Sequence, residues 1–245
     1  MRLPIAILFL AGCAPATAPA VSPAPAPSSA TAESLALPTS VRWTRGSAEH
    51  RMLFEQVYAG ATRALDSLVR AQDVGEWAVI LDADETIIDN SEYQRRRALL
   101  DSGFTASSWS AWVAERAATT LPGARQFLSH VRDRGGRVVI VTNRTQAECP
   151  DTRANLEALE LATDLVLCRV DGPQGSDKNA RFAAVQSGNA AVGFPPMNVL
   201  LWVGDNIQDF PALTQAARDA GPEVISLFGR RYFILPNPMY GSWDR

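Results

Sequence analysis

The chain has 245 residues, of which 47% are hydrophobic and 20% are charged, and its formal net charge is -3 at pH 7. A chain of this length and composition can close one sizeable hydrophobic core, so we expect one globular domain. The slightly acidic balance provides no excess positive charge for binding a polyanion through counterion release, which argues against a nucleic-acid polymer as a partner.

The N-terminus has the pattern of an export signal. Arg2 precedes an apolar run, Leu3 to Leu10, which is too short to span a bilayer but suits a signal peptide. The following sequence, LAGC, resembles the bacterial lipobox, in which the chain is cut before the cysteine and the cysteine is lipidated. We therefore expect residues 1–12 to be a lipoprotein signal peptide and Cys13 to carry a lipid anchor in the cell envelope, on the outer-membrane or periplasmic side. An ordinary secretory peptide cut elsewhere is the alternative.

Residues 13–40 form the next segment, and Ala14 to Ala30 consists almost entirely of Ala, Pro, Ser and Thr. Such a composition cannot bury apolar surface and favours extended polyproline geometry. At about 3.1 Å per residue this segment could reach roughly 50 Å. We interpret it as a stalk between the membrane and a catalytic domain that occupies residues 41–245.

Within that domain, apolar residues recur at helical spacing between Ser47 and Ala71, which predicts an amphipathic helix. Short apolar runs predict strands at 77–81, 137–141, 165–168, 198–203 and 223–228. Strands that alternate with helices indicate an α/β, Rossmann-like fold with a mostly parallel sheet covered by helices on both faces. Ligands bind such sheets beyond the carboxyl ends of the strands.

About fifty residues separate the first predicted strand from the second, more than a simple crossover needs. This stretch contains a predicted helix around Ser107–Ala118, on which Trp109 and Trp112 share one face. We expect a small helical cap at about residues 92–121, with Trp112 as a packing residue.

Acidic residues follow two of the predicted strands. Asp82 and Asp84 come directly after the first strand, and Asp205 and Asp209 follow the fourth. Two carboxylates about 4 Å apart repel by about 4 kcal/mol at an effective dielectric of 20, so such a group calls for a cation or a shared proton. Oxygen ligands of this kind suit Mg²⁺. The alternative is structural, with Asp205 and Asp209 capping a helix and the other pair starting a turn.

Segments in the same order resemble the motifs of the haloacid dehalogenase-like hydrolases: VILDADETIIDNSEYQ, VVIVTNR, SDK and VGDNIQDF. More narrowly, WSAWVAERAATTLPGA and ILPNPMYGSWD resemble the bacterial lipoprotein e family, the class C non-specific acid phosphatases with four motif aspartates. The resemblance extends from about Ser47 to Trp243. It implies the haloacid dehalogenase-type fold, hydrolysis of phosphomonoesters, a Mg²⁺ cofactor and a homodimer.

The resemblance also assigns roles to the acidic residues. It makes Asp82 the nucleophile that forms an aspartyl-phosphate, and Asp84 the residue that donates and later accepts a proton. It places Mg²⁺ between Asp82, Asp205 and the backbone carbonyl of Asp84. Asp209 would act behind these groups, orienting Lys178 or a metal-bound water.

For the phosphate itself, the resemblance implies contacts from the hydroxyl of Thr142 and the ammonium of Lys178. Asn143 adjoins the same motif, where it can donate a hydrogen bond or shape a turn. Trp109 and Tyr240 match residues that sandwich a nucleobase or nicotinamide ring, and such stacking contributes about 1–3 kcal/mol per base. We therefore expect a 5′-nucleotidase that acts on 5′-nucleotides or nicotinamide mononucleotide. The alternatives are a phosphatase for other monoesters, such as sugar phosphates, and a surface lipoprotein that binds haem or another planar cofactor.

The remaining cysteines and histidines give weaker indications. Cys149 and Cys168 could form a disulfide in an exported protein or stay as two free thiols. His50 and His130 lie beside no motif, so we expect both to be surface or capping residues. Trp243 is expected to pack against the domain.

Overall fold

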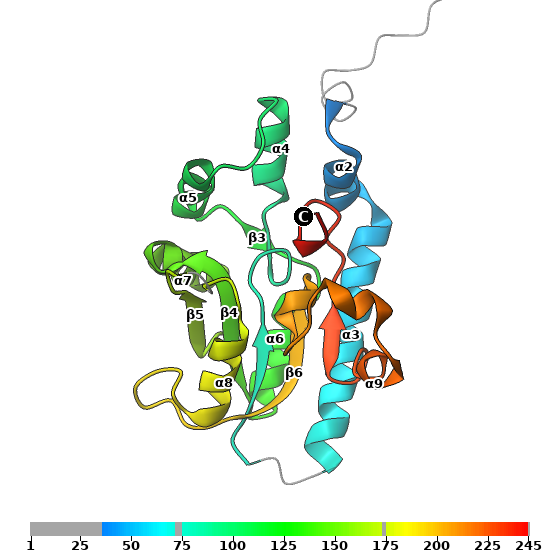
Figure 1. Cartoon of the computed structure of the whole chain (residues 1–245), viewed down its shortest axis with the longest axis vertical. Helices are drawn as coiled ribbons and strands as arrows, with labels where there is room; N and C mark the ends of the chain where they lie inside the picture. Colours follow the sequence, from blue (N-terminus) through cyan, green and yellow to red (C-terminus); the bar gives the residue numbers. More distant parts are fainter. Residues whose placement is uncertain (1–35, 72–74, 173–174, 245) are drawn as a thin grey trace, which may run out of the picture. The chain divides into compact units, whose positions relative to one another are not determined.

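A computed structural model describes residues 36–71, 75–172 and 175–244 (Figure 1). The predicted signal peptide, Cys13 and the stalk up to residue 35 lie outside these residues. Within the described ranges, no helix is both long enough and apolar enough to cross a membrane.

The core of the fold is a five-stranded sheet in which every neighbouring pair is parallel, with strand order β5-β4-β1-β6-β7. Its strands are β1 Trp77–Leu81, β4 Arg137–Thr145, β5 Leu165–Arg169, β6 Asn198–Gly204 and β7 Tyr232–Ile234. A second, antiparallel pair consists of β2 Ile88–Asp89 and β3 Thr119–Thr120. The predicted α/β fold with a mostly parallel sheet is confirmed.

Helices cover both faces of this sheet because alternate residues of each strand point to opposite sides. In β1, Val79 and Leu81 join one apolar cluster, and Ala78 and Ile80 join the other. The first cluster packs against α3 Ala48–Ala71, α6 Ala124–Asp133 and α7 Cys149–Ala158, and the second against α8 Asn179–Ser187. With both faces covered, all of β1 is buried, as its continuous apolar sequence predicts. The predicted helix from Ser47 to Ala71 is confirmed as α3, and the shorter α2 Thr39–Gly46 precedes it.

Two further helices, α4 Ser91–Leu99 and α5 Ala106–Glu115, lie between β1 and β4 in sequence. The Thr105 side chain and Ser108 form a capping box that starts α5. Figure 1 shows α4 and α5 (green) as a separate group of helices beyond the end of the sheet. We call these two helices the cap. Trp112 is buried, as predicted.

The predicted strand at 223–228 is wrong. This stretch begins with a short helix, α9 Pro222–Ile225, and the last strand of the sheet, β7, comes later in the chain. Pro222 lies in the first turn of α9, where the fixed φ of proline suits a helix and its missing N–H costs no hydrogen bond. Ile225 is exposed, whereas a strand inside this sheet would bury it.

Two predictions about single side chains are also wrong. Trp243 is 52% exposed and does not serve as a packing residue. His50 is buried, with its ring against Trp43 and Phe54. The ring partners of His50 come from α2 and from the next turn of α3, so its burial depends on how these two helices pack together.

The question left open for the cysteines is decided by a disulfide between Cys149 and Cys168. It ties the first residue of α7 to β5, and both cysteines are buried. The start of α7 is thereby fixed directly after the predicted phosphate-binding segment of β4.

Candidate active site

The site lies where β1 and β6 end, at the same edge of the sheet. Leu81 pairs with Val203 in parallel register, and the Asp82 N–H donates to the Val203 carbonyl at 3.0 Å. This register brings the residues after both strands together, as the sequence predicted. Beyond β1 the chain turns sharply at Glu85, whose φ of 51° is in the left-handed region, uncommon for a residue other than glycine.

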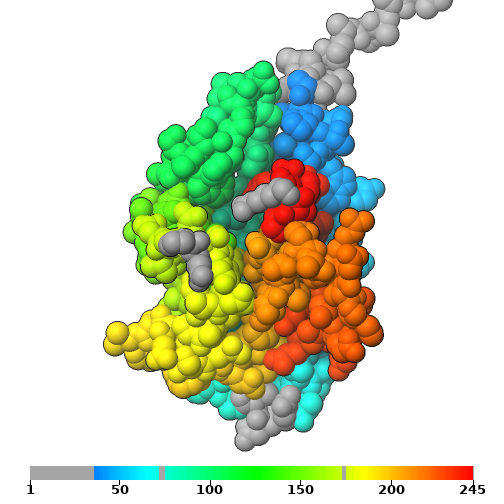
Figure 2. Space-filling model, viewed as in Figure 1, coloured from blue at the N-terminus to red at the C-terminus, as the bar shows by residue number. Residues whose placement is uncertain are grey.

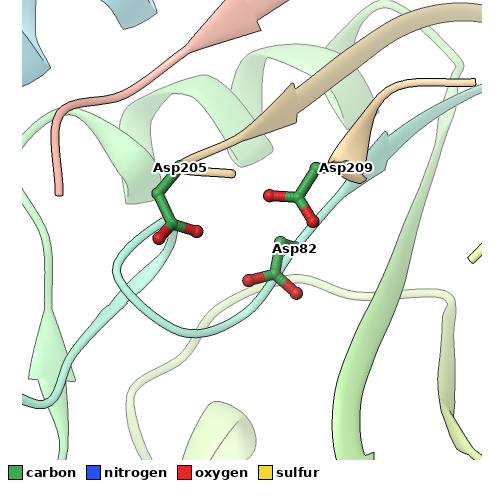
Figure 3. A group of neighbouring side chains, drawn as sticks. All are labelled: Asp82, Asp205 and Asp209. Atoms are coloured by element: carbon green, nitrogen blue, oxygen red, sulfur yellow. The ribbon is translucent and has the colours of Figure 1, made fainter. Parts of the chain in front are cut away.

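Three carboxylates meet at this edge. Asp82, Asp205 and Asp209 each offer an oxygen atom within 4.8 Å of the others, and Figure 3 shows their side chains converging. The pKa of Asp82 is raised to about 7, chiefly by burial; Lys178 opposes the rise, and Asp209 and Asp84 add to it. Burial, together with Asp209 and Asp82, also raises the pKa of Asp205 well above its ordinary range. When ionised, the three carboxylates carry more negative charge than Lys178 alone neutralises.

Lys178 lies just before α8, and its side chain is only 4% exposed. Its Nζ donates to Asp82 and, at 2.7 Å, to Asp209. Burial lowers the pKa of Lys178, but the two carboxylates outweigh burial and raise it, so the ammonium stays charged. The second oxygen of Asp209 accepts the Asn206 N–H at 2.9 Å. Asp209 is thus placed to hold Lys178 in position.

Asp209 approaches the backbone of β6 unusually closely, and a glycine permits this. A Cβ added to Gly204 would lie 2.3 Å from the Cβ of Asp209 and 2.3 Å from its Oδ2. Only a residue without a side chain leaves room for the carboxylate there.

The predicted phosphate-binding residues of β4 differ in their exposure. Asn143 is exposed and lines the cavity described below, with its Nδ2 donating to the Ser176 carbonyl at 3.0 Å. Thr142 is fully buried, does not line that cavity, and its Oγ1 accepts the N–H of Arg144 at 3.2 Å. The carbonyl of Thr142 accepts a hydrogen bond from Arg181.

The sequence analysis missed two polar residues that surround Asp84. Arg144, which is 2% exposed, donates to the Asp84 carboxylate through Nη2 at 2.7 Å and Nε at 3.0 Å. Asn90 is fully buried and donates to the same carboxylate at 2.9 Å. An arginine within the strand motif VVIVTNR was the one available signal, because a buried charge in a strand needs a partner.

A cavity of about 590 Å³ connects these groups to the cap and to the C-terminal segment. Figure 2 shows the surface hollowed between the cap (green) and that segment (red). Charged side chains line the floor of the cavity, and aromatic rings line its walls. The lining includes Asp82, Asp84, Asn143, Lys178, Asp205 and Asp209, with Phe104, Trp109 and Tyr240.

The family is identified by comparison with known proteins. Residues 13–243 match the family model described as the haloacid dehalogenase superfamily, subfamily IIIB (acid phosphatase). The chain belongs to this acid phosphatase family. It is therefore a phosphoric monoester hydrolase, as the motifs predicted.

Solved structures agree with the assignment of this chain to the acid phosphatase family. A class C acid phosphatase from Bacillus anthracis is 26% identical, with a TM-score of 0.73 over 86% of this chain and 87% of that chain. A second structure, the class C acid phosphatase from Bacillus anthracis with tungstate bound, is 25% identical and has a TM-score of 0.71 over the same shares. The predicted haloacid dehalogenase-type fold is confirmed.

The charge of the acid phosphatase site also fits a divalent cation. Buried carboxylates converge with one ammonium among them, and carboxylate oxygens are the ligands that hard cations prefer. Burial and, after it, mutual repulsion raise the pKa values of Asp82 and Asp205, and such a cation would stabilise their ionised forms against both.

Proposed function

We propose that this acid phosphatase is a Mg²⁺-dependent enzyme that hydrolyses 5′-nucleotides or nicotinamide mononucleotide through a phosphorylated Asp82. One observation carries the proposal: a single cavity is lined both by the carboxylates with Lys178 and by the aromatic side chains of Trp109 and Tyr240. A phosphate and a planar ring of one small molecule can therefore be bound together.

In the first step, a carboxylate oxygen of Asp82 attacks phosphorus, and the bond from phosphorus to the ester oxygen breaks. Asp84, which lines the same cavity, gives its proton to the departing oxygen. Water then attacks the aspartyl-phosphate, Asp84 takes a proton from that water, and phosphate leaves. Dividing the hydrolysis into two displacements is the advantage of covalent catalysis.

Lys178 and Asn143 supply hydrogen-bond donors for the phosphate. Lys178 contacts the nucleophile Asp82, so its charge lies where negative charge accumulates during transfer. Asn143 faces the cavity, whereas Thr142 is buried and would act through its backbone or after a local adjustment. A class C acid phosphatase of similar fold binds tungstate, a tetrahedral oxyanion like phosphate, which supports an oxyanion site in this chain.

Asp82, Asp205 and the backbone carbonyl of Asp84 would hold the Mg²⁺ ion, while Asp209 is occupied by Lys178 and the Asn206 N–H. When bound, the ion would reduce the repulsion between an anionic nucleophile and an anionic substrate. Asn237 donates to the Asp205 Oδ2 at 2.8 Å, and the Thr86 hydroxyl contacts its Oδ1 at 3.4 Å, so Asp205 is oriented from both sides.

The aromatic walls favour a substrate with a planar ring. Trp109 projects from the cap, with Phe104 beside it at 6.3 Å between ring centroids, and Tyr240 comes from the C-terminal segment. Stacking on such rings contributes about 1–3 kcal/mol per base and tolerates many bases. We expect the enzyme to accept several rings and to require a terminal phosphate.

We further propose that the mature protein is anchored through a lipid on Cys13, at the outer membrane or on the periplasmic side. The disulfide between Cys149 and Cys168 supports an oxidising compartment. A Cys13→Ser form should leave the membrane fraction; if it still partitions with membranes, the anchor is wrong. Family resemblance also suggests a homodimer, which the mass of the purified protein in solution would test.

Phosphate release from nucleotides, nicotinamide mononucleotide and sugar phosphates, with and without Mg²⁺, tests the enzyme directly. Asp82→Asn should abolish turnover while the protein stays folded. Trp109→Ala should lower kcat/KM for nucleotides by about 5- to 150-fold, the equivalent of 1–3 kcal/mol, and should lower kcat/KM for a ring-free monoester much less. Equal losses on both substrates, or a preference of the parent enzyme for sugar phosphates, would contradict the nucleotide assignment.

A further inference from the structure

The carboxylate of Asp84 is connected to the cap by buried hydrogen bonds. The indole Nε1 of Trp112, on α5, donates to Oδ1 of Asn90 at 2.8 Å. The amide Nδ2 of Asn90 donates in turn to Oδ1 of Asp84 at 2.9 Å. Arg144 joins both residues, since its Nη2 lies 3.2 Å from Oδ1 of Asn90 and 2.7 Å from Oδ1 of Asp84.

The donors to Asp84 are distributed unequally between its two oxygens. Oδ1 accepts from Asn90 Nδ2, Arg144 Nη2 and Arg144 Nε. The hydrogen bond to Oδ2 comes from the same Nε at 3.2 Å. Oδ1 is therefore anchored, and Oδ2 is the oxygen with capacity to carry a proton toward a substrate.

Two other residues of α5, Trp109 and Ser110, make contacts with Arg144 and with the segment before α7. Nη1 of Arg144 reaches Thr152 Oγ1 at 3.3 Å on α7, and the Arg144 guanidinium lies 5.4 Å from the centroid of the Trp109 ring. Ser110 donates to Glu148 at 2.7 Å, just before α7. Helix α5 thus bears both a wall of the substrate cavity and a hydrogen bond that orients Asn90.

We propose that Trp112, Asn90 and Arg144 are positioning residues that orient the carboxyl group of Asp84 toward the leaving oxygen. The orientation of Asp84 then depends on how α5 packs against the rest of the site. The inference rests on the proposed function. As the bond from Asp82 to phosphorus forms and the ester bond breaks, the proton on Asp84 moves to the departing oxygen. That transfer needs Asp84 in one orientation, which its anchored oxygen provides.

The test uses substituted phenyl phosphates whose phenols range from acidic to weakly acidic. All carry one phenyl ring, so ring stacking changes little along the series. An acidic phenol leaves with little help, whereas a weakly acidic phenol needs the proton from Asp84. The quantity to measure is kcat/KM, because it reports the steps up to transfer of the phosphoryl group to Asp82 and excludes the later hydrolysis.

Trp112→Phe keeps an aromatic ring and removes the N–H that holds Asn90. We expect kcat/KM for 4-nitrophenyl phosphate to stay within about threefold of the parent, while that for phenyl phosphate falls by at least a further tenfold, part of the 10²–10⁴ that a general acid contributes. Trp202→Phe is the matched control, because the Trp202 indole N–H is also buried but has no hydrogen-bond partner in the described residues. Any loss of kcat/KM in the Trp202→Phe control should be the same for every phenyl phosphate in the series.

A second variant, Arg144→Lys, keeps the charge and loses the paired contacts with Asp84. It should therefore steepen the dependence of kcat/KM on the acidity of the leaving phenol in the same way as Trp112→Phe. It serves if Trp112→Phe fails to unfold cooperatively. Equal losses along the series in both variants would overturn the inference, as would a steeper dependence in Trp202→Phe. In an Asp84→Asn background, Trp112→Phe should add no further steepening; a full additional effect would also overturn it.

Failure of the proposed function gives a different result. If Asp84→Asn itself leaves the dependence on the phenol unchanged, Asp84 is not the acid, and the assignment of roles is wrong irrespective of the network. If Asp84→Asn steepens the dependence and Trp112→Phe and Arg144→Lys do not, only the positioning role is wrong.

Discussion

Gly204→Ala should impair the enzyme through Asp209 without touching the substrate. The new Cβ would lie 2.3 Å from the Cβ of Asp209 and 2.5 Å from its Cγ. Carbon atoms in contact are about 3.5–4.0 Å apart, so the carboxylate has to move by at least about 1 Å. A shift of this size breaks the contact of 2.7 Å with Lys178 or the contact of 2.9 Å with the Asn206 N–H.

We expect kcat to fall about 10²-fold, the usual effect of a misplacement of about 1 Å at a catalytic group. Overpacking should lower the free energy of unfolding by about 1–3 kcal/mol, or about 2–12 °C in Tm for a domain of this size. The assays are aryl phosphate turnover at saturating Mg²⁺ and thermal denaturation. Gly46→Ala is the control, since no atom lies within 4 Å of a Cβ there. If Gly204→Ala matches the control in kcat, Asp209 does not position Lys178 as argued.

Three further outcomes are expected. Burial lowers the pKa of His50 below 6.5, so its protonation favours the unfolded chain and stability falls as the pH drops through that value; His50→Phe should shrink the difference in Tm between about pH 7 and pH 5, and an unchanged difference would contradict this. Replacing Cys149 and Cys168, 19 residues apart, with Ala should lower the free energy of unfolding in denaturant by about 3 kcal/mol. If a reductant leaves the free energy of unfolding of the parent protein unchanged, the disulfide does not stabilise the fold. Asn237→Ala should raise the Mg²⁺ concentration for half-maximal activity by about 10-fold, because Asp205 loses the shorter of its two hydrogen bonds; an unaltered metal titration would show that Asn237 does not orient Asp205 for the ion.

The sheet and the acidic edge were predictable because their signals are local. The apolar runs of β1 and β6 are continuous and end directly in acidic residues, and in a parallel sheet the ends of neighbouring strands must meet. The run at 223–228 is also largely apolar, but it contains Glu223 and Ser226 and its first part belongs to α9. A short apolar run cannot distinguish a strand from a helix until it is known which side chains the rest of the chain buries.

The polar network around Asp84 could not be predicted from the sequence. Arg144 and Asp84 are 60 residues apart, and Asn90 contacts Trp112 across 22 residues, so neither pairing has a spacing rule. Trp112 taken alone suggests only a packing residue, and Asn90 and Arg144 taken alone suggest surface positions. Their burial is favourable only because every partner arrives together.

Both walls of the cavity are tied to a carboxylate. On one side, Trp112 and Asn90 connect the cap to Asp84. On the other, Asn237 accepts the N–H of Tyr240 at 3.4 Å and donates to Asp205. Reshaping either wall for a different ring therefore also moves a group beside the phosphate. Changes of substrate in this scaffold are expected to alter kcat together with KM, because the residues that select the ring and those that do the chemistry share hydrogen-bond partners.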